Sequence, residues 1–144
     1  MANYRTTVTS PRPADEVFTY LARFSNAAVW DPGVTAAAEL APEGPMLGSR
    51  YRLEVKAFGR SVPLVYEIVE FDPPRRVALA AENAALRSFD VIEVSPAPDG
   101  GSVVAYDATL ALKGIAAVLT PVLGAAFRRI GDRAAAGLSK ALGA

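Results

Sequence analysis

Apolar and polar residues follow two different periods along this chain, and the changes between them divide it into elements. Residues 3–9 are rich in β-branched and aromatic types, which predicts a strand. In residues 13–24 apolar side chains recur every three or four positions, so we expect a short amphipathic helix that starts at Pro13. A short turn or helix at 26–30 then leads to the breaker Asp31-Pro32-Gly33.

From residue 34 to residue 112 the chain has the pattern of short strands separated by turns. Turn-forming residues gather at 42–45, 58–59, 72–74, 82–83 and 98–101, and six strands fit around these breaks. Because the connections are short, neighbouring strands must pair antiparallel. The pattern therefore predicts an antiparallel sheet with one apolar face.

Two of these strands show their faces clearly. Residues 51–56 alternate strictly, which places Tyr51, Leu53 and Val55 on the apolar face. In residues 62–71 the same alternation directs Tyr66 inward. Pro63 has no N–H to give to a neighbouring strand, so we expect it at a sheet edge or a bulge.

The strand at 86–94 leaves two alternatives open, because both of its faces mix apolar and polar residues. If Ile92 faces the interior, Asp90 does too, and desolvation would raise its pKa. If Phe89 faces inward instead, Asp90 is a surface carboxylate and Arg87 points into the protein. The first alternative makes Asp90 the best candidate for an acid–base group.

The end of the chain combines one more strand with a long helix. In the strand at 103–112, side-chain volume favours the set with Val104 and Tyr106 inward and Asp107 exposed. Residues 114–142 return to helical spacing and predict one long helix with an apolar stripe. Within it, either Thr120 caps a new helix or Pro121 kinks a continuous one.

Composition excludes several classes of function. The chain has 144 residues, enough for one domain over 1–144 with its own core, and 15 basic against 15 acidic residues give no net charge to attract nucleic acid. It contains neither cysteine nor histidine, so thiol chemistry and the commonest general base and metal ligand are absent. We expect no bound metal and no cofactor.

The sequence also argues against a membrane protein. The most apolar segment, 114–127, is only 14 residues long and is followed by Arg128 and Arg129, whereas a membrane span needs about 20 apolar residues. The first residues lack the pattern of a signal peptide. We therefore expect a cytoplasmic protein, which the lack of cysteine fits. The oligomeric state stays open, with a homodimer as one option.

Four short motifs resemble a known family. They are residues 13–18 with the later 30–33, the strand end at 69–76, the turn at 98–101 before 103–106, and the segment 110–114 before the last helix. Together they are similar to the START-like superfamily, also called SRPBCC, in its polyketide cyclase/dehydrase and lipid-transport branch. The resemblance covers essentially the whole chain, but these motifs specify the fold better than the activity.

The resemblance implies an α+β helix-grip fold, in which a seven-stranded antiparallel sheet wraps a long C-terminal helix. It also implies a cavity between sheet and helix for an apolar or aromatic molecule such as a polyketide, an aromatic metabolite or a lipid. No catalytic motif of the family matches residue by residue. Fold alone therefore leaves binding and catalysis both open.

Candidate site residues follow from the predicted faces. Tyr66 and Tyr51, on adjacent strands, and Asp90 are weak candidates for acid–base roles, and ordinary core roles for the tyrosines are the alternative. The residues that we expect to contact a ligand are Trp30, Tyr51, Leu53, Tyr66, Leu123, Phe127 and Ile130.

The leading hypothesis is a domain that binds a small hydrophobic molecule, and the alternative is a polyketide cyclase or dehydratase that uses carboxylate and tyrosine groups. A buried Asp90 that faces the ligand with a raised pKa would favour the enzyme, whereas a cavity lined only by apolar atoms would favour the binder. A third hypothesis is a module whose basic last helix docks an acidic protein. A core without a cavity would favour that one.

Overall fold

The structure is a computed structural model that describes all residues except 42, 58, 115–116, 118–119 and 144. Seven strands and one long helix make up most of it, and a shorter helical segment follows the first strand. The elements are β1 (Ala2–Ser10), α1 (Ala14–Ala22), the 3₁₀ turn η1 (Phe24–Asn26), α2 (Ala27–Trp30), β2 (Val34–Glu39), β3 (Arg50–Ala57), β4 (Arg60–Asp72), β5 (Arg76–Glu82), β6 (Leu86–Pro96), β7 (Ser102–Leu112) and α3 (Thr120–Ala141).

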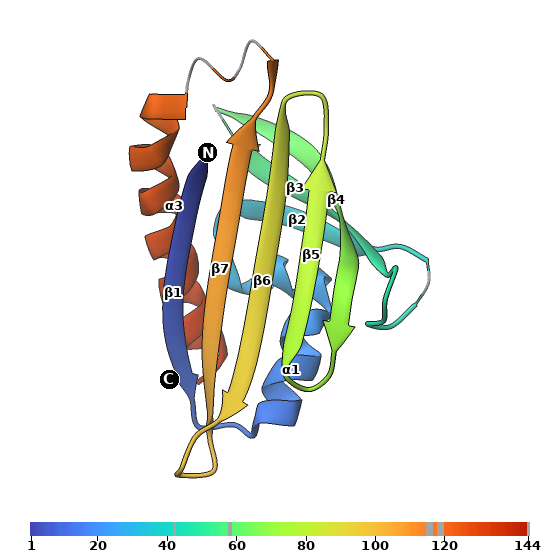
Figure 1. The fold of residues 1–144 in the computed structure, drawn as a ribbon, viewed down its shortest axis with the longest axis vertical. Coiled ribbons are helices and arrows are strands. Elements are labelled where there is room, and N and C mark those ends of the chain that lie inside the picture. The colour runs from blue at the N-terminus through green and yellow to red at the C-terminus, as the bar shows by residue number, and fades with distance from the viewer. Residues whose placement is uncertain (42, 58, 115–116, 118–119, 144) are drawn as a thin grey trace.

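The seven strands form one antiparallel sheet in the order β1-β7-β6-β5-β4-β3-β2. Strands β2 to β7 follow one another as a meander, and β1 pairs with β7 at the far edge. The sheet curls, and α3 lies along its inner side next to β1 (Figure 1). The predicted α+β architecture of seven antiparallel strands and a C-terminal helix is confirmed.

Pro63 lies at a position of β4 where a backbone N–H would have no strand partner. It pairs with Glu54 of β3 on one side, and the pairing of β4 with β5 begins only at Glu67. The first half of β4 is therefore a local sheet edge, as predicted. Further along β4, the register with β5 shifts between Ile68 and Glu70, so a bulge helps the sheet to bend there.

The structure settles the inward face of both ambiguous strands. In β6, Asp90 and Ile92 are buried, whereas Phe89 on the opposite face is 40% exposed. In β7, Val104 and Tyr106 face inward, as side-chain volume predicted. The alternative with Phe89 and Arg87 inward is thus wrong, because β6 pairs with β7 in the register that directs Ile92 toward the same face as Tyr106.

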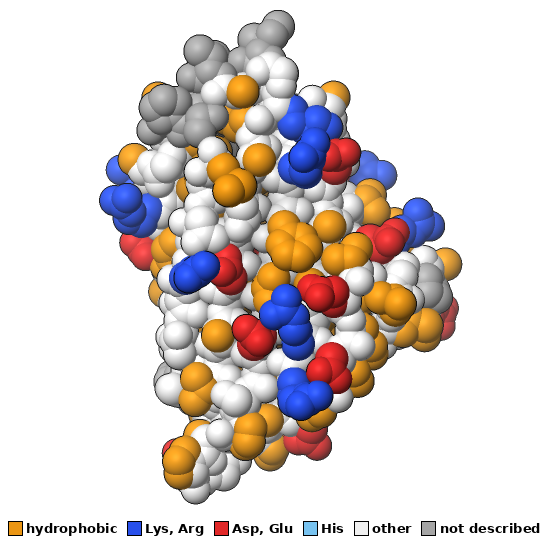
Figure 2. Space-filling view, in the orientation of Figure 1, with side chains coloured by type: hydrophobic (Ala, Val, Ile, Leu, Met, Phe, Trp, Pro, Cys, Tyr) orange, Lys and Arg blue, Asp and Glu red, His pale blue; other side chains and the backbone are white. Residues whose placement is uncertain are grey.

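The outer face of the sheet is polar and faces solvent. Arg5 of β1 pairs with Asp107 of β7 at 2.8 Å, and Arg76 of β5 lies 3.5 Å from Glu93 of β6. Basic and acidic side chains stand next to one another over this face, with hydrophobic side chains between them (Figure 2). The sheet therefore has one face for the core, which is the concave one.

Of the two alternatives for the last helix, the structure agrees with the one in which a new helix begins at Thr120. α3 starts at Thr120, not at residue 114, and Gly114 has a φ of 58°, which a right-handed helix does not allow. Two residues that the predicted stripe included, Ile115 and Leu119, lie outside the described residues. Because the helix starts at Thr120, Pro121 stands in its first turn, where a proline is tolerated. No helix in the described ranges is long and apolar enough to cross a membrane.

The C-terminal half of α3 is held tightly against the rest of the protein. Leu138 and Leu142 are fully buried, and the Ser10 hydroxyl donates a hydrogen bond of 2.7 Å to the Leu142 carbonyl. At Gly137 the helix backbone touches the carbonyl of Trp30 so closely that a Cβ would overlap that oxygen. The N-terminal half of α3 is more exposed, and only Leu123 is buried there among the side chains described.

We predict that Gly137→Ala destabilises the protein by about 2 kcal/mol, because the new methyl group must push α3 away from the Trp30 backbone. Gly124→Ala is the matched control in the same helix, where a Cβ would meet nothing within 4 Å. This control should be neutral or gain up to about 1 kcal/mol from helix propensity. Urea unfolding of the two variants measures the difference, and equal midpoints would contradict the tight contact.

Candidate functional site

A cavity of about 910 Å³ lies between the concave face of the sheet and α3. All strands except β5 contribute to its walls, and α2 and α3, from Leu123 to Leu138, cover it. Most of the surface is apolar, and typical apolar wall residues are Leu53, Leu64, Leu86, Leu110, Leu123 and Phe127. We call this space the central cavity, and its size falls within the range of about 300–1,000 Å³ that is usual for ligand sites.

The central cavity brings together six of the seven residues that the sequence assigned to ligand contact. The six that line it are Trp30, Leu53, Tyr66, Leu123, Phe127 and Ile130. Ile130 is 42% exposed, so it stands at the rim.

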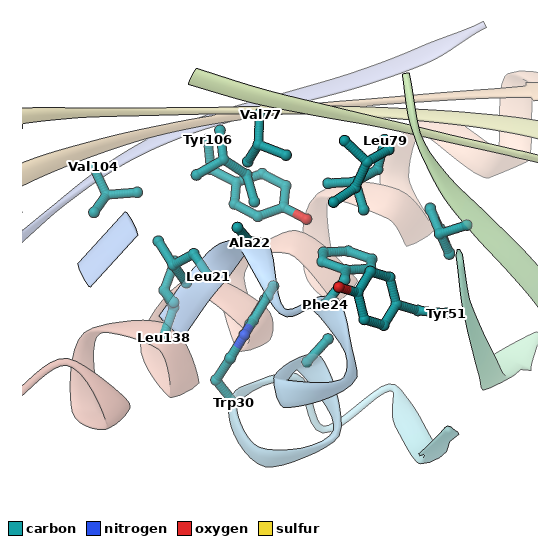
Figure 3. Packing of buried hydrophobic residues seen from close by; sticks show 14 of the residues in the cluster. Leu21, Ala22, Phe24, Trp30, Tyr51, Val77, Leu79, Val104, Tyr106 and Leu138 are labelled. Carbon is teal, nitrogen blue, oxygen red and sulfur yellow. The ribbon is translucent and has the colours of Figure 1, made fainter. Parts of the chain in front are cut away.

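Tyr51 is the residue that the structure places elsewhere. It stands at the start of β3, beside Tyr66 in the strand register, and is completely buried away from the cavity wall. Figure 3 shows its ring packed near Phe24. Only residues further along β3, such as Leu53 and Val55, reach the central cavity. Tyr51 is therefore a core residue, and its buried hydroxyl has no partner of hydrogen-bond geometry among the described residues.

A chain of four polar side chains interrupts the apolar wall. The Ser88 hydroxyl donates to Asp90 Oδ1 at 3.3 Å, and the Tyr106 hydroxyl donates to Asp90 Oδ2. The Ser88 hydroxyl has one proton, and this proton is used in the hydrogen bond to Asp90. In the 2.9 Å hydrogen bond between Tyr66 and Ser88, the Tyr66 hydroxyl is therefore the donor. All four residues line the central cavity, and we call them the polar cluster.

Burial controls the protonation of the polar cluster. It raises the pKa of Asp90 to about 6, although the hydrogen bonds from Tyr106 and Ser88 act in the opposite direction. Burial also raises the pKa of Tyr66 and of Tyr106, and the nearby charge of Asp90 adds to both shifts. At neutral pH both tyrosines therefore keep their protons, whereas Asp90 is close to its titration range.

Aromatic rings surround the polar cluster. Phe24 packs edge-on against Tyr66 with ring centroids 4.9 Å apart, and Trp30 packs edge-on against Tyr106 at 5.7 Å. Phe24 and Trp30 themselves meet at 6.4 Å. Figure 3 shows Trp30 and Phe24 rising from the helical segment toward the sheet. These ring contacts restrict the side chains of Tyr66 and Tyr106 and so hold their hydroxyls in place.

A second carboxylate lines the same cavity. Asp31 follows α2, is half-buried, and accepts a hydrogen bond of 2.8 Å from the Gly33 N–H. Burial raises the pKa of Asp31, and the hydrogen bond from Gly33 partly offsets this. No group of three or more His, Cys, Asp or Glu side chains able to hold a metal occurs in the part of the chain that the structure describes.

Sequence reasoning missed Ser88, Tyr106 and Asp31 as members of the site. Tyr106 had been placed on the inward face of its strand, but its distance from Asp90 depends on the register of β6 against β7. In that register Asp90 pairs with Ala108 and Ile92 with Tyr106, so Tyr106 is the diagonal neighbour of Asp90. Strand register was the missing information, and alternation alone does not supply it.

Comparison with known proteins agrees with the geometry. The family model described as "Polyketide cyclase / dehydrase and lipid transport" matches residues 1–143, so the chain belongs to this family. Its fold is that of the START-like superfamily, and the cavity between sheet and helix is the ligand-binding feature of that fold. A search of curated proteins found no match.

Solved structures share the fold at low sequence identity. A START superfamily protein from Mycobacterium smegmatis aligns with a TM-score of 0.76 and 15% identity over 99% of this chain and 97% of its own. The Zhui aromatase/cyclase from Streptomyces sp. R1128 aligns with a TM-score of 0.79 and 15% identity over 97% and 92%. A protein from Geobacillus kaustophilus gives 0.71 and 16% over 97% and 93%.

The raised pKa of Asp90 predicts a pH-dependent stability difference. Its pKa is about 6 in the folded protein, above the ordinary value of 3.8, so the folded state holds this proton more tightly than the unfolded chain. Stability from this group is complete below about pH 4 and is lost as the pH rises through 6. Asp90→Asn stays neutral at every pH and keeps one acceptor oxygen, so its stability relative to the wild type should rise by about 2–3 kcal/mol between pH 4 and pH 7.

Urea unfolding of both proteins from pH 4 to pH 7 measures this gain. A constant difference between the two proteins across that range would show that Asp90 does not have a raised pKa. Carboxyl ¹³C NMR of Asp90 provides an independent measurement of the same proton.

Proposed function

We propose that this protein binds a small, largely apolar or aromatic molecule in the central cavity. The observation that carries the proposal is the cavity itself, because about 910 Å³ of mostly apolar space inside a small domain is otherwise costly in packing energy. Family membership points the same way, since the family description names polyketide cyclases and lipid transport. A polyketide, an aromatic metabolite and a lipid are the classes of molecule that fit.

In this proposal the polar cluster orients the ligand. Asp90 with its two hydroxyl donors is a polar patch deep in a mostly apolar wall, so a hydroxyl or carbonyl group of the ligand gains most by lying there. The edges of Trp30 and Phe24 offer aromatic surface beside it. A ligand with one polar end group and a flat or extended apolar body meets both requirements.

Filling the cavity with a larger side chain should weaken ligand binding without unfolding the protein. Ala108 faces Asp90 across the strands and lines the cavity, so Ala108→Phe puts a ring into the ligand space. The matched control is Ala105→Phe, on the exposed outer face of the same strand. With the neutral fluorescent probe 1-pyrenebutanol, we expect Kd to rise at least about tenfold for Ala108→Phe and to stay unchanged for Ala105→Phe.

Fluorescence polarisation measures the Kd values, and circular dichroism checks that both variants are folded. Binding that is equally strong in a folded Ala108→Phe variant would contradict this site. So would a wild-type protein that does not bind the probe.

A second candidate function is acid–base catalysis on a polyketide-like ketone, as in a cyclase or dehydratase. It is favoured by Asp90, a buried carboxylate on the cavity wall whose pKa of about 6 suits proton transfer near neutrality. In this proposal the Asp90 carboxylate takes a proton from the carbon next to a carbonyl. The Tyr66 hydroxyl then turns its one proton from Ser88 to the enolate oxygen that forms and donates a hydrogen bond to it.

Proton exchange into a simple ketone tests this second function. With 1-tetralone in D₂O, an acid–base site should speed hydrogen–deuterium exchange next to the carbonyl about a hundredfold over buffer. Asp90→Asn should lose this acceleration but still bind 1-pyrenebutanol. ¹H NMR follows the exchange, with Ala108→Phe as a folded control whose site is blocked. A wild-type rate equal to that of buffer would leave the protein as a binder only.

A further inference from the structure

The charged residues that line the central cavity are divided between its interior and its mouth. The mouth consists of the lining residues that are exposed to solvent, and its charged members are Lys56, Arg60 and Arg133. Lys56 and Arg60 stand near the hairpin that joins β3 to β4, and Arg133 comes from α3. The strands and the helix are on different sides of the cavity, so positive charge is present on both sides of its opening.

These three cations have no partners in the described part of the protein. None of the three side chains makes an ion pair or a hydrogen bond there, whereas cations on the outer face of the sheet, such as Arg76 and Arg87, are paired with glutamates. Arg128, Arg129 and Lys140 of α3 have no ion pair in the described residues either, but they do not line the cavity. The mouth therefore carries three positive charges that no acidic side chain of the described residues neutralises.

The interior has the opposite character. Its charged lining residues are the carboxylates Asp31 and Asp90, and no basic side chain lies among the buried residues of the wall that the structure describes. An anionic group placed deep in the cavity would lose its hydration and would meet the negative charge of Asp90. At the mouth the same group stays hydrated and has three cations within its field.

We propose that the molecule held in the central cavity is an amphiphile with an anionic group, whose apolar body lies inside and whose anionic end stays at the mouth beside Lys56, Arg60 and Arg133. This inference rests on the proposed binding function and narrows its ligand class. The chemistry that fits is a carboxylate, or a sulfate or phosphate ester, on an aromatic or aliphatic body. The cationic mouth selects the anion by long-range attraction, so its effect is largest at low ionic strength.

Three pyrene probes that differ in their end group test the inference. They are 1-pyrenebutyrate, the neutral 1-pyrenebutanol and the cationic 4-(1-pyrenyl)butylamine, and fluorescence polarisation gives each Kd at 20 mM and 300 mM salt. We expect pyrenebutyrate to bind about tenfold more tightly than pyrenebutanol at low salt, because exposed charge pairs each add a factor of roughly two to five. The advantage should shrink at high salt.

The triple variant Lys56→Gln/Arg60→Gln/Arg133→Gln should lose the preference for pyrenebutyrate and keep its affinity for pyrenebutanol. The matched control is Arg128→Gln/Arg129→Gln/Lys140→Gln, which removes the same charge from exposed positions of α3 that do not line the cavity. This control should keep most of the preference. Its result separates a local effect of the mouth from an effect of net charge.

The outcomes distinguish this inference from the proposed function. If none of the three probes binds, the proposed function fails. If pyrenebutanol binds as tightly as pyrenebutyrate, or the amine binds most tightly, the cavity holds ligands but the anionic class is wrong. Equal losses in the two triple variants would likewise overturn the role of the mouth.

Discussion

The attachment of α3 by one end is the constraint on which the rest of this structure depends. The C-terminal half of the helix is fixed by the backbone contact of Gly137 with Trp30 and by the buried Leu138 and Leu142. Trp30 in turn packs on Tyr106 of the sheet, so the helical segment 24–30 acts as a spacer between α3 and β7. Because the spacer sets the distance at one end, the other half of the helix spans the curved sheet without filling the space beneath it, and a cavity remains.

The polar cluster shows that this space is not simply a packing defect. A buried carboxylate is unfavourable unless hydrogen bonds compensate its lost hydration, and Asp90 has only two neutral donors and no cation near it. An apolar residue at this position would remove that cost from the fold. Local departures from good packing chemistry are expected where function requires them, and the position of Asp90 on the cavity wall therefore supports the proposed binding site.

Sequence reasoning reached the fold more fully than the site, and particular residues show why. Alternation along 51–56 and the position of Pro63 depend on local chemistry, and both were predicted. The start of α3 at Thr120 was one of two alternatives that the sequence left open, because the apolar residues before it have helical spacing although the backbone at Gly114 is left-handed. Tyr51 and Tyr106 are both inward tyrosines, but only Tyr106 reaches the cavity, and that depends on where each lies along its strand relative to the curl of the sheet.

Binding and catalysis would use the same arrangement here, and the difference lies in the ligand. The Tyr106 and Ser88 hydroxyls donate hydrogen bonds to Asp90, and the raised pKa of Asp90 leaves it able to accept or donate a proton near neutral pH. A ligand without an acidic C–H bond next to this carboxylate is only held, whereas a ketone placed with its α-carbon there is exposed to a base on one side and to hydroxyl donors on the other. A charged end group fixed at the mouth would decide which atom of the ligand arrives at Asp90, because the distance between mouth and polar cluster is set by the fold. Under the proposed function, ligand length would then determine whether a ligand is only held or also reacts.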